Sequence, residues 1–86
     1  MNYTNYDRFA AIYVTALTDA MEARPSDYAK RPGETWSDQA RWTVGKMMPA
    51  LARRTAIISP VVRSVARSLG IKPTATAIAD WLEGKP

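Results

Sequence analysis

The chain has 86 residues, with 12 Lys and Arg, 8 Asp and Glu, no His, no Cys and a net charge of +4. This length allows one domain, residues 1–86, with a thin core. Without Cys the chain has no disulfide, and without His and Cys it lacks the usual zinc ligands and the common nucleophile–base pairs. We therefore expect a protein that is not an enzyme and that holds no cofactor and no metal.

The charge is distributed unevenly along the chain. Residues 1–38 carry a net charge of −2, residues 39–79 carry +7 without any Asp or Glu, and residues 80–86 carry −1. Such asymmetry predicts that residues 39–79 bind phosphate groups or an acidic protein surface. The alternative is a solvated basic face without a partner. We expect these cations to share one outer surface, with the acids elsewhere.

Hydropathy and the first residues bear on location. No apolar run approaches the roughly 18–20 residues of a membrane span, and the start of the chain lacks the basic and apolar segments of a secretory signal. We therefore expect a cytoplasmic protein without a membrane partner.

The spacing of apolar residues predicts a first helix over residues 4–23. Thr4 followed by Asp7 is typical of a capping box at its start. The apolar positions of this helix form one stripe: Tyr6, Phe9, Ala10, Tyr13, Ala16, Leu17, Ala20 and Met21. Tyr6 and Tyr13 are interpreted as core rings, with a stacking platform for bases as the alternative. Pro25 ends the helix, because the residue before a proline disfavours the helical conformation.

A second helix is predicted from residue 35 to about residue 54, and Thr35 with Asp38 repeats the capping pattern. Its apolar stripe is Trp36, Ala40, Val44, Met47 and Leu51. Pro49 has no N–H and its ring meets the carbonyl of Gly45, so we expect a kink or a break there. Trp42 lies far from the stripe, so it either covers another element or serves a partner.

Two short helices follow. Ser59 before Pro60 is a strong start signal for a helix over residues 60–69, and Gly70 marks its end. Arg63 and Arg67 are four residues apart, so they project outward side by side.

The last helix is predicted over residues 74–83, with Ile78, Trp81 and Leu82 facing inward and Gly84 closing it. The predicted fold is therefore all-α: a small compact four-helix orthogonal bundle with a helix-turn-helix-like C-terminal pair.

The segment Val65–Ile71 resembles the middle of a helix-turn-helix unit, in which a small residue packs at the crossing and Gly makes the turn. The expected outward face of the last helix has no Arg, Asn or Gln for base edges; it comprises Thr76, Ala79, Asp80 and Glu83. Its two carboxylates would meet phosphates. Contact with nucleic acid would then fall to Arg63 and Arg67, as backbone contacts without sequence readout.

Two segments resemble short bacteriophage and prophage accessory proteins: residues 46–50 (Lys-Met-Met-Pro-Ala) and residues 66–82. The shared ending is Leu-Gly-Ile, two residues, Thr, two residues, Ala-Ile, two residues, and an aromatic residue with Leu; here it spans residues 69–82. The resemblance is clearest over the last ~20 residues. It implies a phage source and supplies no catalytic residues. Ala75 and Thr76 stand where the family usually has basic or aromatic residues.

These observations lead to one functional expectation. The protein is expected to bind a host protein or protein–nucleic-acid complex and to modulate or inhibit it, with anti-defence activity, anti-CRISPR in particular, as the named form. The expected partner-binding residues are the cations of the back half and the off-face Trp: Arg41, Trp42, Lys46, Arg53, Arg54, Arg63, Arg67 and Lys72. The phage source places this activity in the host cytoplasm.

Two alternatives stay open. The first is a DNA-binding regulator of helix-turn-helix type that contacts DNA or RNA phosphates through the basic back half. The second is an assembly protein that dimerises through Trp42 and the adjacent Met47 and Met48, although we favour packing as the role of the two Met residues. The sequence is compatible with a monomer or a homodimer.

Overall fold

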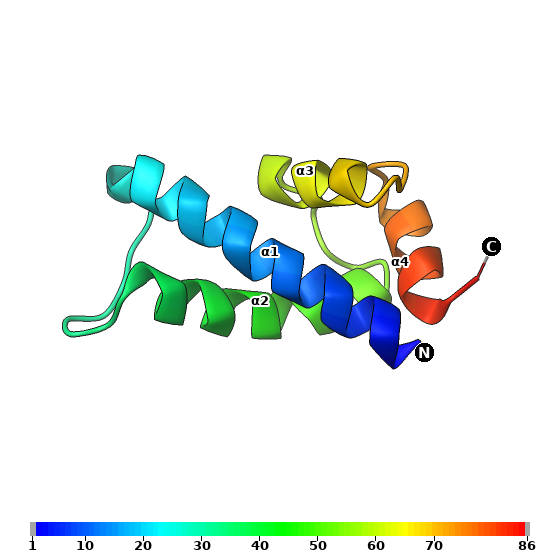
Figure 1. The fold of residues 1–86 in the computed structure, drawn as a ribbon, viewed down its shortest axis with the longest axis horizontal. Coiled ribbons are helices and arrows are strands. Elements are labelled where there is room, and N and C mark those ends of the chain that lie inside the picture. The colour runs from blue at the N-terminus through cyan, green and yellow to red at the C-terminus, as the bar shows by residue number, and fades with distance from the viewer. Residues whose placement is uncertain (1, 86) are drawn as a thin grey trace.

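The computed structural model describes residues 2–85; residues 1 and 86 lie outside the described part of the chain. All regular secondary structure in residues 2–85 is helical (Figure 1). Four α-helices and one short 3-10 turn follow one another: α1 Tyr3–Ala23, η1 Pro25–Asp27, α2 Trp36–Ala52, α3 Pro60–Ser68 and α4 Ala75–Glu83. The predicted all-α fold with two longer helices followed by a shorter pair is confirmed.

Helix α1 is the element on which the others pack. It contacts α2, α3 and α4, and α4 also contacts α2. Figure 1 shows α1 and α2 running in opposite directions, with α3 along one side of this pair and α4 at the end where α1 begins. The domain measures 41 × 20 × 19 Å along its principal axes, so α1 and α2 set its long dimension. None of the helices in residues 2–85 combines the length and apolarity needed to cross a bilayer.

The core lies between α1 and the three helices packed on it. Its buried side chains on α1 recur every fourth residue, at Phe9, Tyr13, Leu17 and Met21. The largest side chains that are almost completely inaccessible come from all four α-helices: Phe9, Met48, Leu51, Ile78, Leu82, Val62 and Val65. Interpretation of Tyr13 as a core ring is therefore confirmed; it meets Phe9 edge to face, with 6.3 Å between ring centroids.

The start of α1 differs from the prediction. The side chain of Asn2 caps the helix by accepting the N–H of Asn5 at 3.0 Å, so Thr4 is not the cap. Asn5 in turn donates its side-chain amide to the carbonyl of Trp81 at 2.8 Å, and the N–H of Asn2 donates to the carbonyl of Leu82. The cap position is therefore fixed by contact with the end of α4, which no local pattern reveals.

Helix α2 begins as predicted and ends at Ala52, close to the predicted end near residue 54. Both bonds of the capping box between Thr35 and Asp38 are present, each at 3.1 Å. Of the expected kink or break at Pro49, the break does not occur, because one continuous helix runs through Pro49 to Ala52. Gly45, four residues earlier, has no side chain and nothing within 4 Å of its would-be Cβ, so this turn is uncrowded beside the Pro ring.

The buried face of α2 agrees with the predicted stripe in part. Met48 is buried with 1% exposure, whereas Met47 is only partly buried against the core, and so is Trp36. Ala40, Val44 and Leu51 are buried as predicted, and Met48 is buried in place of Met47.

The ends of α3 and α4 follow the predicted signals. Ser59 accepts the N–H of Val62 at 3.2 Å, and Gly70 adopts the left-handed conformation with φ +72°. The N–H of Ile71 donates to the carbonyl of Ala66 at 2.8 Å, which completes a Schellman turn. One residue of α4 was misplaced: Ala79, predicted to face outward, is completely buried.

Candidate functional site

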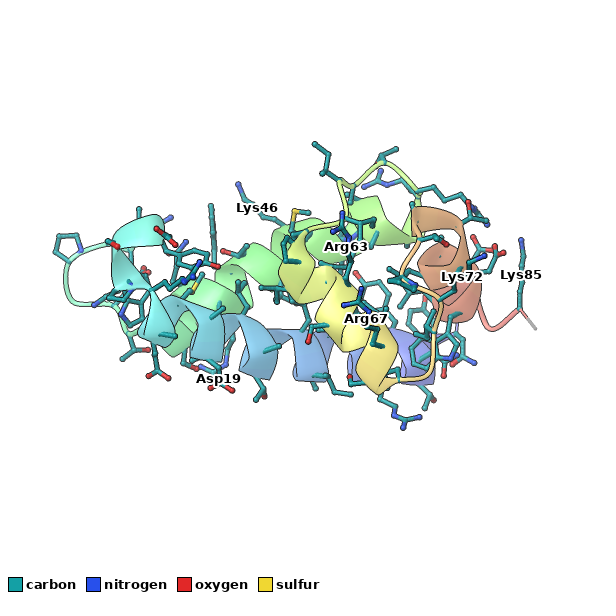
Figure 2. All side chains as sticks on the ribbon, turned by 90° about the horizontal axis from the view of Figure 1, so that it is seen from above. Asp19, Lys46, Arg63, Arg67, Lys72 and Lys85 are labelled. Carbon is teal, nitrogen blue, oxygen red and sulfur yellow. The ribbon has the colours of Figure 1, made fainter. Side chains whose placement is uncertain are left out.

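Helix α3 presents two arginines on its outer surface. Its inward positions, Val62, Val65 and Ala66, are buried, so Arg63 and Arg67 emerge on the opposite side, one turn apart. Lys72 is exposed in the loop that follows. Figure 2, which looks onto α3, shows both arginines along the helix and Lys72 in the region between α3 and α4. We call these three residues the α3 cationic row.

The α3 cationic row has no neutralising partner within residues 2–85. Arg63, Arg67 and Lys72 take part in none of the salt bridges formed among the described residues. A shallow groove of about 470 Å³ between α1 and α3 is lined by Ser64 and Ser68 and, across it, by Asp19. Two adjacent arginines repel each other by a few tenths of a kcal/mol, and an anionic partner relieves that repulsion.

Arg54 is held by α4 instead of facing a partner. Its guanidinium pairs with the carboxylate of Asp80 and lies 3.9 Å from that of Glu83. Lys85, 2.9 Å from Glu83, lowers the pKa of Glu83 through a hydrogen bond and its charge, and Arg54 adds to that effect. The carboxylates of α4 are therefore occupied by cations of this chain, contrary to the expectation that they face outward freely.

Arg41 lies in the first half of α2, and Arg53 caps the C-terminal end of this helix. Arg41 is 3.6 Å from Asp38 within the same helix. It also lines a groove between α1 and α2 together with Tyr6. The Arg53 side chain donates to the carbonyl of Pro49 at 3.2 Å. Burial raises the pKa of Tyr6, and the positive charge of Arg53 partly opposes this rise. Arg41 therefore contacts groups on the side of α2 that faces the groove, and Arg53 contacts the last turn of the helix.

Trp42 forms a second exposed cluster with cations of the chain. It is 48% exposed. The Nζ of Lys46 lies 4.2 Å from the centroid of its ring, and the guanidinium carbon of Arg31 lies 5.6 Å from it. Lys46 stands one turn after Trp42, a spacing visible in the sequence, whereas Arg31 comes from the loop before α2 and was missed. Such cation–π contacts contribute about 0.5–1 kcal/mol each at exposed sites.

The expectation of one shared cationic surface is therefore wrong in part. Arg41 and Arg54 have carboxylate partners, and the remaining predicted residues separate into the α3 cationic row, the Trp42–Lys46 pair and Arg53. The Met surface expected for the assembly alternative is also reduced, because Met48 is buried. Five of the predicted cations have no carboxylate partner among the described residues, and the α3 cationic row supplies three of them; the other two are Lys46 and Arg53.

The described residues contain no group of three or more His, Cys, Asp or Glu side chains placed to hold a metal ion. Comparison with protein-family models, with curated protein sequences and with solved structures gives no match for this chain.

Proposed function

We propose that this protein is a non-enzymatic binding protein that places the α3 cationic row on an anionic surface of a host macromolecular machine and so modulates or blocks it. The observation that carries the proposal is the pairing of Arg63 and Arg67 on the outside of α3 without a carboxylate partner in residues 2–85. Charged patches of this kind steer association and help to select the partner.

The host setting rests on the resemblance to phage accessory proteins. Within it, anti-defence activity in the host cytoplasm, and inhibition of a CRISPR complex in particular, is the named form that we propose. Helix α3 is only nine residues long and is seated on α1. A partner that docks there meets a pre-formed surface, so little ordering is needed on this side of the interface.

The test is capture from host lysate by the immobilised protein, with and without nuclease. The Arg63→Glu/Arg67→Glu variant reverses the charge of both arginines of the row. The Arg8→Glu/Arg24→Glu variant makes the same change in net charge at an exposed position within α1 and at the exposed residue that follows this helix. We expect the wild type and the α1 variant to retain a host component that the α3 variant loses. Equal capture by all three would contradict the proposal.

Sequence-independent contact with nucleic acid is the second candidate. It gains support because Asp80 and Glu83, which would otherwise repel phosphates from the C-terminal helix pair, are engaged by Arg54. Base reading has no comparable support, because Thr76 is the exposed polar residue of α4 and the helix carries no Arg, Asn or Gln.

Salt discriminates this second candidate. Binding of the three row cations to phosphates should weaken about tenfold or more between about 50 and 200 mM salt for any duplex sequence. Absence of any shift of a duplex in a gel at 50 mM salt would exclude phosphate contact and leave an acidic protein surface as the partner.

A further inference from the structure

A cavity of about 530 Å³ lies away from the α3 cationic row, between the second half of α1, η1, the middle of α2 and the start of α3. Its lining combines apolar and polar groups of these elements: Tyr13, Leu17, Ala20, Ala23, Arg24, Asp27, Tyr28, Thr43, Ser59, Pro60 and Val61. A volume of this size is within the range of small-molecule sites, which are mostly apolar with a few placed polar groups.

Tyr13 supplies an unused hydroxyl to this cavity. The residue is only 3% exposed, and its hydroxyl makes no hydrogen bond to a described residue. Within residues 2–85, every side-chain nitrogen or oxygen that is completely inaccessible has a hydrogen-bond partner. The unpaired Tyr13 oxygen must therefore retain some accessible surface. The oxygen therefore opens onto the cavity that Tyr13 lines.

The neighbourhood keeps this hydroxyl protonated. Burial raises the pKa of Tyr13 above its ordinary value of 10.0, and the nearby phenol of Tyr28 adds to the rise. A partly desolvated donor of this kind gains more from a ligand acceptor than an exposed hydroxyl does, because it lacks a full water shell.

The start of α3 adds a second donor. Ser59 accepts the N–H of Val62, Pro60 has no N–H, and the N–H of Val61 has no hydrogen-bond partner among the described residues. The N-terminus of a helix carries a partial positive charge that favours anions. At the rim, the Arg24 side chain is 80% exposed, and its guanidinium lies 4.0 Å from Asp27, which is the only carboxylate of the described lining.

We propose that this cavity binds a small carboxylate with an apolar body. The Tyr13 hydroxyl and the N-terminus of α3 would receive the carboxylate, and the side chains of Leu17 and Ala20 would contact the body. The two donors favour an anion over a neutral analogue, because hydrogen bonds to a charged acceptor are the stronger ones.

The test compares 4-phenylbutyrate with 4-phenylbutan-1-ol, which has the same apolar body without the charge. In two-dimensional amide NMR of the whole chain, we expect the acid to shift the signals of Val61 and Leu17 and to bind about tenfold more tightly than the alcohol. Equal binding of the two compounds, shifts confined to another surface, or no binding of the acid at millimolar concentration would each overturn the proposal.

Two variants refine the test. Tyr13→Phe keeps the ring packed on Phe9 and removes the hydroxyl, so it should weaken the acid about tenfold and leave the affinity of the alcohol unchanged. Tyr6→Phe, on the same helix but outside the cavity, is the matched control and should change neither affinity. If Tyr13→Phe binds the acid as the wild type does, the hydroxyl is not part of the site and the proposal is wrong.

Discussion

Arg54, just after the end of α2, pairs with Asp80 of α4, a residue 26 positions further along the chain. Arg54 also has a positive φ of 62°, a conformation that favours Gly. Its N–H donates to the carbonyl of Leu51 at 3.2 Å, and the N–H of Thr55 donates to that of Ala50 at 3.0 Å, as in a Schellman turn. The ion pair thus connects α4 to the turn after α2, in which Arg54, a residue other than Gly, adopts a left-handed backbone conformation.

Substitution of Arg54 should separate these two effects. Arg54→Ala removes the ion pair, worth up to about 1 kcal/mol for a partly exposed pair, and keeps the strained φ. Arg54→Gly removes the same pair but relieves the strain of about 1 kcal/mol. We expect the Gly variant to be the more stable of the two by about 1 kcal/mol in urea unfolding followed by circular dichroism. Equal midpoints for the two variants would show that the turn is unstrained.

Gly84 and Gly45 should respond to Ala in opposite ways. Gly84 has φ +81°, and a Cβ there would lie 3.0 Å from the side-chain nitrogen of Asn2 and 3.1 Å from its Cβ. Gly84→Ala should therefore cost about 1–2 kcal/mol, because it strains the backbone and disturbs the Asn2 cap.

Gly45 is the matched control, since it lies inside α2 with nothing within 4 Å of its would-be Cβ. Gly45→Ala should stabilise the protein by about 0.5–1 kcal/mol through helix propensity. Thermal midpoints of the two variants, measured at one protein concentration, check both signs. A stabilised Gly84→Ala variant would mean that the end of α4 does not rest on Asn2.

Local signals predicted the helices well because their physics is local. The capping box of Thr35 with Asp38, and Ser59 before Pro60, each satisfy N–H groups within three or four residues, so the sequence alone indicates them. The same holds for the Gly70 turn. Apolar spacing also located the buried face of α1, where the side chains repeat every fourth residue.

The predictions failed where contacts between segments distant in the sequence determine the structure. Asn2 replaces Thr4 as the cap because the carbonyls at the end of α4 hold Asn2 and Asn5. Arg54 is not free to bind a partner as predicted, because Asp80 and Glu83 of α4 pair with it. A linear charge count cannot place such partners, so the count predicted one surface where the structure has separate groups of cations.

The capping box should make stability depend on pH. Hydrogen bonds from the backbone N–H and side chain of Thr35 lower the pKa of Asp38 below its ordinary value of 3.8, and the charge of Arg41 adds to this effect. Because the folded pKa is the lower one, the stabilisation is present above the unfolded pKa and is lost as pH falls through the folded pKa.

Asp38→Asn should remove this component. We expect the urea midpoint of the wild type to fall more steeply than that of the variant between about pH 5 and pH 2, where the carboxylate is protonated. Asp19→Asn is the control, because Asp19 is an exposed acid outside any salt bridge among residues 2–85. Parallel curves for the wild type and Asp38→Asn would refute a role of the carboxylate.

Substitution of Trp42 tests whether the proposed interface extends beyond α3. Its ring is 48% exposed and is flanked by Lys46 and Arg31, so Trp42→Ala should lower stability only modestly, by about 1 kcal/mol. If a partner covers this ring together with the α3 cationic row, the same variant should weaken capture of the host component tenfold or more, as expected for a Trp at a binding hot spot.

Ile57→Ala is the matched control for Trp42→Ala, because Ile57 is an apolar side chain with 88% exposure in the loop before α3. The measurement pairs the dissociation constant with the urea midpoint for each variant. A loss of affinity in Trp42→Ala that exceeds its loss of stability, with Ile57→Ala unchanged, would assign the ring to the interface. Unchanged affinity in Trp42→Ala would confine docking to α3, since Lys46 and Arg31 then serve only to cover an exposed ring.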